Sequence, residues 1–525
     1  MHFINDDTLS LSTKPATRDG AASGDLTALL GTLIDAQPAA TLSRLRSLLT
    51  ASPRLRAAVA DQLDDAMATD RQLDVEVDRI ATAAVYAQER FAKWAVERVD
   101  RLLADLAETF AEASRDLAEA TVRETGLGNV DDKADKNRFA SLGIYESLAS
   151  GPMIGEARRD SVREVVDIAS PIGVVFGIVP VTNPVATAMF KTLIALKAQN
   201  ALMLSFHRNA FAVGQLTGAI VRDVLEAHGA PTNLVQVLGL RGSRKATMKM
   251  MRHPAVSLIL ATGGAGLVTA AYSSGKPAIG VGPGNAPAWI CADADLEHAA
   301  HSIVTSKTFD NGLICGAEHN LVVDDRSVDA FVRALERNGA AVLAADEAKR
   351  FAAAAVDRAS ASLRGDFIGR TAAEIATAVG VHRPEPPRLL VVPAALGDVE
   401  TFYGREKLAP FLSLFTVAGE DEGLQVSRRL LTHEGAGHTA IIHSTNAARI
   451  ERFAQAMPAG RILVNSPAAQ GCCGMTTGLE RSLTLGCGTF GGNSTTDNIT
   501  YRHLVNVKRV AHYVEPGTGR ERPHA

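Results

Sequence analysis

Residues 172–184 read IGVVFGIVPVTNP. The run Ile172–Val179 is short, apolar and bounded by turn residues, which predicts a buried strand. A helix is expected to begin at Pro184, because proline suits the first position of a helix. The segment therefore reads as a strand that passes directly into a helix, the first half of a βαβ unit.

The same alternation continues along the chain. Apolar runs followed by helical stretches are Ala201–Leu204 with a helix to about His228, Leu234–Leu238 with Lys245–Met251, and Ser257–Leu260 with a helix opening at Gly263–Gly266. It resumes after residue 315 with Leu321–Val323, a helix around Val328–Arg337, Leu389–Val392, Pro410–Val417 and Ala440–His443. This pattern predicts parallel α/β sheets, which bind ligands at the carboxyl ends of their strands. The stretch 503–510 alternates in hydrophobicity, which is typical of an edge strand.

Composition excludes several classes of protein. A chain of 525 residues is long enough for two to four folded units. With 54 basic and 58 acidic residues the net charge is −4, so neither nucleic acid nor an anionic membrane is an expected partner. Five cysteines without framework spacing indicate a reducing compartment, and no apolar run is long enough for a membrane span. With no export signal recognised, a cytoplasmic location is expected.

The first 75 residues carry two helical patterns, followed by long helices to about residue 150. Leucines and Ile34 form an apolar stripe over residues 26–34, and a second pattern over residues 42–49 ends at Pro53. Two interpretations remain open. The segment is either a helical cap on the main body or a docking peptide that lays its apolar face into a partner's groove.

Cys315 is the leading candidate for a nucleophile. It lies in TFDNGLICGA, residues 308–317, where small neighbours let a substrate approach the sulfur. A thiolate attacks carbonyl carbon well and divides a difficult reaction into two steps. A buried, inert cysteine is the alternative, and the sequence does not show the local electrostatic field that would separate the two.

Two further segments offer groups for binding. The stretch ATGGAG, residues 261–266, follows a predicted strand and presents backbone N–H groups and a helix N-terminus to an anion such as a pyrophosphate. A tight turn without a ligand is the alternative reading. Asn183 follows the strand Ile172–Val179, so its amide could stabilise an oxyanion, although an asparagine before proline is also an ordinary N-cap.

A metal site is not expected. Cys472, Cys473 and Cys487 lack the spacing of zinc ligands. The segment His433–His438 resembles HExxH, but its second histidine is one residue late and glycines interrupt it, so we interpret it as a turn.

Several motifs together resemble the CoA-acylating branch of the aldehyde dehydrogenase superfamily. They are IVPVTNP (178–184), FKTLIALK (190–197), LILATGG (258–264), AYSSGKPAIG (271–280), SKTFDNG (306–312) and SLTLGCG (482–488). The resemblance covers about residues 75–512. It implies the α/β fold of that family, with a Rossmann-like, parallel-sheet cofactor domain, an α/β catalytic domain and a small β oligomerisation arm. The domain boundaries expected from it are 1–74 for an N-terminal extension, 75–283 for cofactor binding, 284–470 for catalysis and 471–525 for the arm and tail.

The resemblance also implies roles for individual residues. Cys315 is the expected nucleophile, and Asn183 with the backbone N–H of Cys315 is the expected oxyanion hole. Glu406 matches the acid that holds the nicotinamide ribose. The full set expected to bind the cofactor is Val179, Pro180, Thr182, Ser205, His207, Thr262, Gly263, Gly264, Gly282 and Glu406.

One departure from hydrolytic relatives determines the expected reaction. Where those enzymes carry the glutamate that activates water, VGPGN (281–285) places Val281. Coenzyme A, rather than water, is then expected to release the acyl group from Cys315. The expected substrates are a short aldehyde of the acetaldehyde or sulfoacetaldehyde type, NAD and coenzyme A. For an anionic aldehyde, Arg481 and Arg208 are weak candidate anchors. Two other functions stay open: a hydrolytic enzyme that takes its base from Glu318 or Glu406, and a catalytically silent assembly component.

The resemblance leaves the cofactor and the assembly less defined. Ser205-Phe206-His207-Arg208 stands where the family usually has Ser-Pro-His-Pro, so NAD is favoured over NADP only weakly. In the family the alternating C-terminal strand pairs across a dimer interface, and a homodimer or homotetramer is expected. Relatives housed in bacterial microcompartments carry N-terminal amphipathic peptides, so luminal targeting through shell proteins is a hypothesis for residues 1–74.

Overall fold

The computed structural model describes residues 53–148, 154–239, 244–357, 360 and 362–514, with side chains from residue 70 onward. The two leucine patterns predicted at residues 26–34 and 42–49 lie outside these ranges. Contacts divide the chain into two units, residues 1–76 and 77–525. The helix α3 (Pro53–Phe91) supplies the described part of the first unit, and everything below concerns the second.

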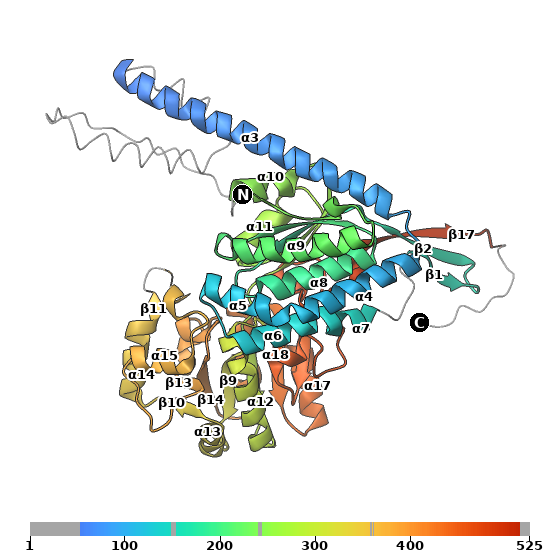
Figure 1. Ribbon diagram of the computed structural model, residues 1–525. Helices are drawn as coiled ribbons and strands as arrows, with labels where there is room; N and C mark the ends of the chain where they lie inside the picture. The colour runs from blue at the N-terminus through green and yellow to red at the C-terminus, as the bar shows by residue number, and fades with distance from the viewer. Residues whose placement is uncertain (1–52, 149–153, 240–243, 358–359, 361, 515–525) are drawn as a thin grey trace. The chain divides into compact units, whose positions relative to one another are not determined.

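A five-stranded parallel sheet forms the first layer of the second unit (Figure 1). Its order is β5-β4-β3-β6-β7, with β5 (Val235–Val237), β4 (Ala201–Phe206), β3 (Val174–Val179), β6 (Val256–Thr262) and β7 (Ala278–Val281). In chain order, the first strand of this sheet is the central strand β3. The next two strands, β4 and β5, extend the sheet on one side of β3, and β6 and β7 then extend it on the other side. Strand order therefore reverses between β3 and β6, the place where open α/β sheets bind their ligands.

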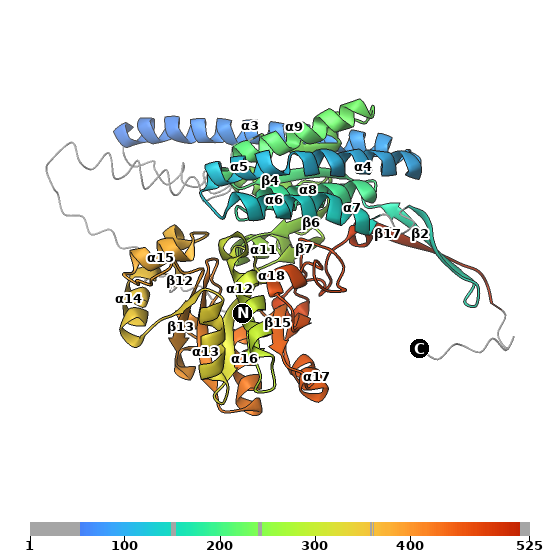
Figure 2. The same ribbon diagram turned by 60° about the horizontal axis from the view of Figure 1, so that its bottom comes forward.

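Helices cover this sheet in two layers on one face. The helix α8 (Pro184–Lys197) follows β3 directly, and every one of its residues is buried. It lies between the sheet and an outer layer of helices, α4 (Val96–Glu112), α5 (Ser114–Thr125), α6 (Val130–Arg138) and α7 (Ile144–Leu148) (Figures 1 and 2). Because α8 contacts protein on both sides, it needs no solvated face, which explains why its sequence is mostly apolar and why its two lysines are buried against internal acceptors.

A second parallel sheet contains seven strands in the order β10-β13-β14-β9-β8-β15-β16. The strands are β10 (Ala340–Val342), β13 (Leu389–Ala394), β14 (Phe411–Val417), β9 (Glu318–Asp324), β8 (Ala286–Ile290), β15 (Gly437–His443) and β16 (Ala459–Val464). All six pairings are parallel. The two α/β sheets confirm the predicted fold class. The turn predicted over His433–His438 is shorter in the structure, because His433 ends α16 (Glu420–His433) and Gly437 and His438 already belong to β15.

A three-stranded antiparallel arm projects from the unit (Figure 2). It joins the hairpin β1 (Gly155–Asp160) and β2 (Val165–Pro171) to the last strand, β17 (Val505–Ala511). One edge of β17 pairs with β2 along all seven residues, from Val505 against Pro171 to Ala511 against Val165. Among the described strands none pairs with the other edge of β17, which is therefore an edge strand as the alternating sequence predicts.

Candidate active site

One cavity of about 960 Å³ lies where the carboxyl ends of β3 and β6 meet the Cys315 segment. It is lined by every one of the twelve residues named as site candidates from the sequence: Val179, Pro180, Thr182, Asn183, Ser205, His207, Thr262, Gly263, Gly264, Gly282, Cys315 and Glu406. These residues come from six separate stretches of the chain. The fold brings them to one place, and their individual roles remain predictions.

The Cys315 segment is held in an unusual backbone conformation. It connects α12 (Leu296–Thr308) to β9 through a short 3₁₀ turn, Phe309–Gly312, and three consecutive residues of that turn are left-handed. Their φ angles are +48° at Asp310, +54° at Asn311 and +73° at Gly312. Non-glycine residues rarely adopt this region unless surrounding contacts impose it, and such strain concentrates at functional sites.

The carbonyl oxygen of Cys315 is fixed from two sides. The ring N–H at Nε2 of His319 donates a hydrogen bond to it over 3.2 Å. The Nδ1 atom of the same ring accepts the backbone N–H of Lys407 at 2.9 Å, so the neutral ring must carry its proton on Nε2. On the other side a side chain at Gly284 would lie 1.8 Å from this oxygen, so only glycine permits the approach.

The Cys315 thiol is partly exposed to the cavity but otherwise enclosed by protein. Burial and then the nearby charge of Glu406 raise the pKa of this thiol well above its usual range. The protein without ligands therefore carries a protonated sulfur at neutral pH. Protonated thiols react slowly with oxidants, so this state protects the sulfur from oxidation.

Asn183 occupies the N-cap position of α8, yet its side chain makes no cap hydrogen bond there. Its Nδ2 instead lies 3.3 Å from the carbonyl oxygen of Leu313, two residues before Cys315. Only its backbone carbonyl serves the helix, accepting the N–H of Thr187. The side chain is thus directed toward the Cys315 segment and not toward the helix, which removes the ordinary capping interpretation for the side chain.

The opposite end of the cavity fits a dinucleotide. Thr262 ends β6, and its buried hydroxyl has no hydrogen-bond partner within the described protein. Gly264 is the N-cap of α11 (Ala265–Tyr272) and has open space around its Cα. A hydroxyl without a partner beside exposed helix N–H groups suits a pyrophosphate. Ser205 and His207 line the same end, where a ribose would be expected.

Comparison with known proteins assigns the family. A sequence profile of the aldehyde dehydrogenase family matches residues 61–505. The chain belongs to the aldehyde dehydrogenase family. It is 38% identical over 445 residues to the bifunctional aldehyde-alcohol dehydrogenase of Escherichia coli K12, covering 84% of this chain and 50% of that protein. The chain therefore spans about half the length of this curated relative.

Two solved structures place the chain in the CoA-acylating branch of the family. An acetylating aldehyde dehydrogenase from Geobacillus thermoglucosidasius is 39% identical, covers 85% of this chain and 98% of its own, and superposes with a TM-score of 0.82. A propionaldehyde dehydrogenase from Rhodopseudomonas palustris with bound CoA and an acylated cysteine is 25% identical, with coverages of 83% and 97% and a TM-score of 0.74.

Carboxylates are scarce around the thiol of this aldehyde dehydrogenase. Val281, at the position expected for a general base, ends β7 and lines the cavity. Glu318 does not line it, because its side chain points into the protein, where the backbone N–H of Ala468 donates to it at 3.0 Å. Glu406 is the one acidic side chain among the described lining residues, and its Oε1 accepts the N–H of Gly284 at 2.8 Å.

The structure places neither of the two arginines considered as anchors for an anionic aldehyde, Arg481 and Arg208, at the substrate end of the cavity. Arg481 donates to the carbonyl oxygen of Gly143 at 2.8 Å and forms an ion pair with Glu146, and it does not line the cavity. Arg208 does line the cavity, but beside Ser205 at the dinucleotide end. Neither arginine is therefore placed to anchor an anionic aldehyde beside the sulfur.

Three buried charged groups were not predicted from the sequence, and all are 3% exposed or less. Lys133 and Lys136 lie beside the Cys315 segment, and Asp310 belongs to its strained turn. The lysines belong to α6 (Val130–Arg138), and its mostly charged sequence, VDDKADKNR, is typical of a helix exposed to solvent. The pairing of His319 with the Cys315 carbonyl was not predicted either. A charged helix with two buried lysines has no recognisable periodicity, so no pattern in the sequence signals them.

The charge of Glu406 gives a pH-dependent prediction. Burial raises the pKa of Glu406 to about 8, so the side chain is neutral at pH 7 and negative at pH 9. Its negative charge raises the pKa of Cys315. We expect Glu406→Gln to leave alkylation of Cys315 by iodoacetamide unchanged at pH 7 and to accelerate it about threefold or more at pH 9. Mass spectrometry of the Cys315 peptide measures the rate.

The exposed carboxylate Glu451 supplies the control for this measurement. Glu451→Gln changes the net charge of the protein by the same amount but should leave the alkylation profile unchanged. An equal acceleration of Glu406→Gln at both pH values would show that Glu406 does not titrate beside the thiol.

Proposed function

We propose that this protein is a CoA-acylating aldehyde dehydrogenase, which oxidises a short-chain aldehyde with a nicotinamide dinucleotide and coenzyme A to acyl-CoA. The observation that carries the proposal is the surroundings of Cys315. The thiol shares a cavity with the Asn183 amide and a dinucleotide cradle, while an apolar Val281 stands at the expected base position. The printed names of the acylating relatives support the same reaction class.

The first half of the proposed reaction forms a thioester on Cys315. The Cys315 thiol first loses its proton to solvent in the cavity. The resulting thiolate attacks the aldehyde carbon, a carbon–sulfur bond forms, and one C=O electron pair moves onto oxygen. The Nδ2–H of Asn183 and the Cys315 N–H would donate to this oxyanion. Within the described residues the Cys315 N–H donates to no protein acceptor, so it is available for that purpose. When bound, the nicotinamide ring supplies the acceptor for the hydride that leaves the same carbon.

The second half transfers the acyl group. The thiol of coenzyme A loses its proton to solvent and its thiolate attacks the thioester carbon. The same two donors stabilise the oxyanion, the bond from carbon to the Cys315 sulfur breaks, and Cys315 leaves as a thiolate. Water competes poorly, because Val281 offers no proton acceptor. Glu406 is the remaining carboxylate, and we assign it to the nicotinamide ribose, with Gly284 fixing one of its oxygens.

Omitting coenzyme A tests this function directly. We expect one burst of NADH formation equal to one per active site, followed by a steady rate of at most about 1% of the complete reaction, because the thioester persists. Rapid-mixing absorbance at 340 nm measures both phases. A steady rate that does not depend on coenzyme A would identify a hydrolytic enzyme instead, and an absence of turnover in every mixture would favour an assembly component.

NAD is the dinucleotide of this proposal, and NADP is the cofactor to compare with it. Arg208 and Arg244 line the cavity near Ser205, and arginines at this place suit the 2′-phosphate of NADP. The ratio of kcat/KM for the two cofactors decides between them. A panel of short aldehydes, including acetaldehyde and sulfoacetaldehyde, identifies the substrate in the same assay.

The remaining assignments extend the family resemblance. We propose the domain boundaries 1–74, 75–283, 284–470 and 471–525, and a homodimer or homotetramer assembled through the arm of β1, β2 and β17. For residues 1–74 we propose targeting to a microcompartment lumen through shell proteins. Deleting residues 1–40 tests the targeting, because a truncated chain that still co-purifies with shell proteins would refute it.

None of the described helices is long and apolar enough to cross a membrane. Among the same residues, no group of His, Cys, Asp and Glu side chains is arranged to hold a metal ion.

A further inference from the structure

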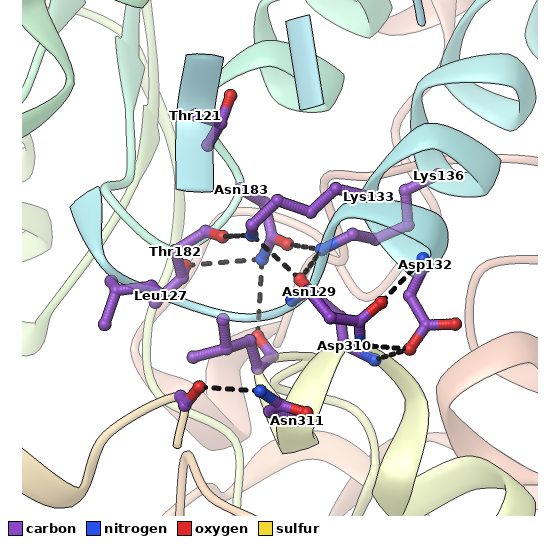
Figure 3. Close-up of polar contacts among 12 residues, drawn as sticks. Thr121, Leu127, Asn129, Asp132, Lys133, Lys136, Thr182, Asn183, Asp310 and Asn311 are labelled. Atoms are coloured by element: carbon purple, nitrogen blue, oxygen red, sulfur yellow. Dashed lines mark hydrogen bonds and ion pairs between the residues drawn. The ribbon is translucent and has the colours of Figure 1, made fainter. Parts of the chain in front are cut away.

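Two lysines and one aspartate form a buried ionic cluster behind the Cys315 segment (Figure 3). Lys133 and Lys136 lie three residues apart on α6, so both side chains leave the same face of that helix. The ammonium of Lys133 lies 3.0 Å from Oδ2 of Asp310, and that of Lys136 bonds to the same oxygen. All three side chains are at most 4% exposed, so the ions are strongly coupled and weakly screened.

The cluster also ties α6 to the strained turn before Cys315. The other oxygen of Asp310, Oδ1, accepts the backbone N–H of Asn129 at 3.1 Å. The Asp310 N–H in turn donates to Asp132 at 2.7 Å. A side chain at Gly128 would lie 2.0 Å from Asp310, so a glycine is required for this close approach. These bonds hold Asp310 in its left-handed conformation and fix the position of the two lysines.

Lys136 makes one contact that Lys133 does not. Its ammonium donates to Oδ1 of Asn183, whereas Lys133 donates to the backbone carbonyl of Thr182 at 3.0 Å. An ammonium has no acceptor, so the Asn183 amide must present its oxygen to Lys136 and its Nδ2 to the other side. Figure 3 shows the two ends of the amide directed in this way.

The bonds made by Nδ2 of Asn183 are long. They reach the Leu313 carbonyl and the Thr182 hydroxyl, each at 3.3 Å. Neutral acceptors at that distance hold an N–H weakly, and a charged oxygen at a shorter distance forms a stronger bond. The amide hydrogens are therefore oriented but only weakly hydrogen-bonded, so they can be donated to a transient oxyanion.

We propose that Lys136 is a positioning residue for the oxyanion hole: its ammonium orients and polarises the Asn183 amide so that Nδ2–H serves the tetrahedral intermediates on Cys315. The inference rests on the proposed function. A cation on the amide oxygen withdraws electrons from the nitrogen and strengthens its N–H as a donor, and low local polarity magnifies the effect. Lys136 also lines the cavity, so its charge acts close to the developing oxyanion.

A double-mutant cycle with Asn183 tests the inference. Lys136→Met keeps the length of the side chain and removes its charge, and it leaves Asp310 paired with Lys133. We expect Asn183→Ala to lower kcat for NADH formation about 10²–10³-fold, and Lys136→Met to lower it about 10–100-fold. The double variant should be no slower than Asn183→Ala by more than about twofold, because Lys136 acts through Asn183.

Lys133→Met is the matched control, since it removes the same charge from the same carboxylate without touching Asn183. Its effect on kcat should multiply with that of Asn183→Ala. A substitution at an exposed position, Lys349→Met in α14 (Ala345–Ala355), controls for differences in kcat that arise from the expression and purification of variant proteins. Lys136→Arg retains a charged donor and should recover part of the activity. If the methionine variant does not fold, Lys136→Gln, which also lacks the charge, replaces it in the cycle.

The outcomes separate the inference from the proposed function. A wild-type protein without CoA-dependent aldehyde oxidation refutes the function itself. A wild-type protein with that activity, combined with full kcat in a folded Lys136→Met variant, overturns only the role of Lys136. Multiplying effects of Lys136→Met and Asn183→Ala overturn it equally, because the two residues would then act independently.

Discussion

Cys315→Ala should lower CoA-dependent NADH formation by about 10⁴-fold or more, while the melting temperature and oligomeric state should stay close to those of the wild type. The large loss is expected because every step of the proposed reaction forms or breaks a bond to this sulfur. The small effect on stability is expected because the side chain faces the cavity and carries little of the core. Steady-state kinetics and thermal unfolding measure the two quantities.

Cys291 provides the control for that substitution. It is also a free cysteine, but it is buried at the end of β8 and does not line the cavity. Cys291→Ala should lose some stability, about 1 kcal/mol, and keep its turnover. If Cys315→Ala retained turnover, or if Cys291→Ala lost it at a temperature where it is folded, Cys315 would not be the nucleophile.

Gly284→Ala should lower kcat/KM about 100-fold without removing any chemical group from the site. The added methyl would lie 1.8 Å from the Cys315 carbonyl oxygen and 2.8 Å from its carbon, both backbone atoms that cannot rotate away. The two segments must separate by about 1.5 Å to restore an ordinary contact, and a displacement of about 1 Å at a reacting group costs about 10²-fold in rate. The His319 hydrogen bond to the same oxygen would be stretched as well.

Gly397→Ala is a suitable control, because an added methyl there meets no atom within 4 Å and Gly397 does not line the cavity. Kinetics should match the wild type in this variant. Unfolding measurements on Gly284→Ala separate misplacement from global destabilisation, for which we expect about 1–3 kcal/mol. Wild-type kcat/KM in Gly284→Ala would mean that the position of the Cys315 carbonyl does not limit the reaction.

Much of the fold followed from local pattern. The segment Ile172–Val179 differs from the observed strand β3 only at its start, because Gly173 adopts a φ of +115° and breaks the strand before Val174. Apolar runs with turn residues at both ends are reliable in this way, because a strand buried on both faces needs an uninterrupted apolar sequence. The two leucine patterns predicted at residues 26–34 and 42–49 lie outside the described residues, so they stay predictions.

The site was predictable where it depends on strand ends and unpredictable where it depends on buried charge. Thr262 ends β6 and Asn183 follows β3, so their positions at the carboxyl edge of the sheet could be inferred from the apolar runs before them. Lys136 could not be found this way. Its burial depends on Asp310, which lies 174 residues later in the chain. A buried ammonium needs acceptors such as this carboxylate, and pairing over that distance leaves no mark on the local sequence.

The antiparallel arm cannot be completed until the end of translation, because it pairs an early strand with the last one. Strand β2 is made more than three hundred residues before β17, the strand that covers one of its edges. A nascent chain therefore carries β2 with that edge uncovered through most of translation, and an uncovered edge recruits strands from other chains. Ribosomal stalling or proteolysis between Val464 and Val505 would leave this edge of β2 unpaired, so such truncated chains should aggregate even though every strand of the two large sheets is present.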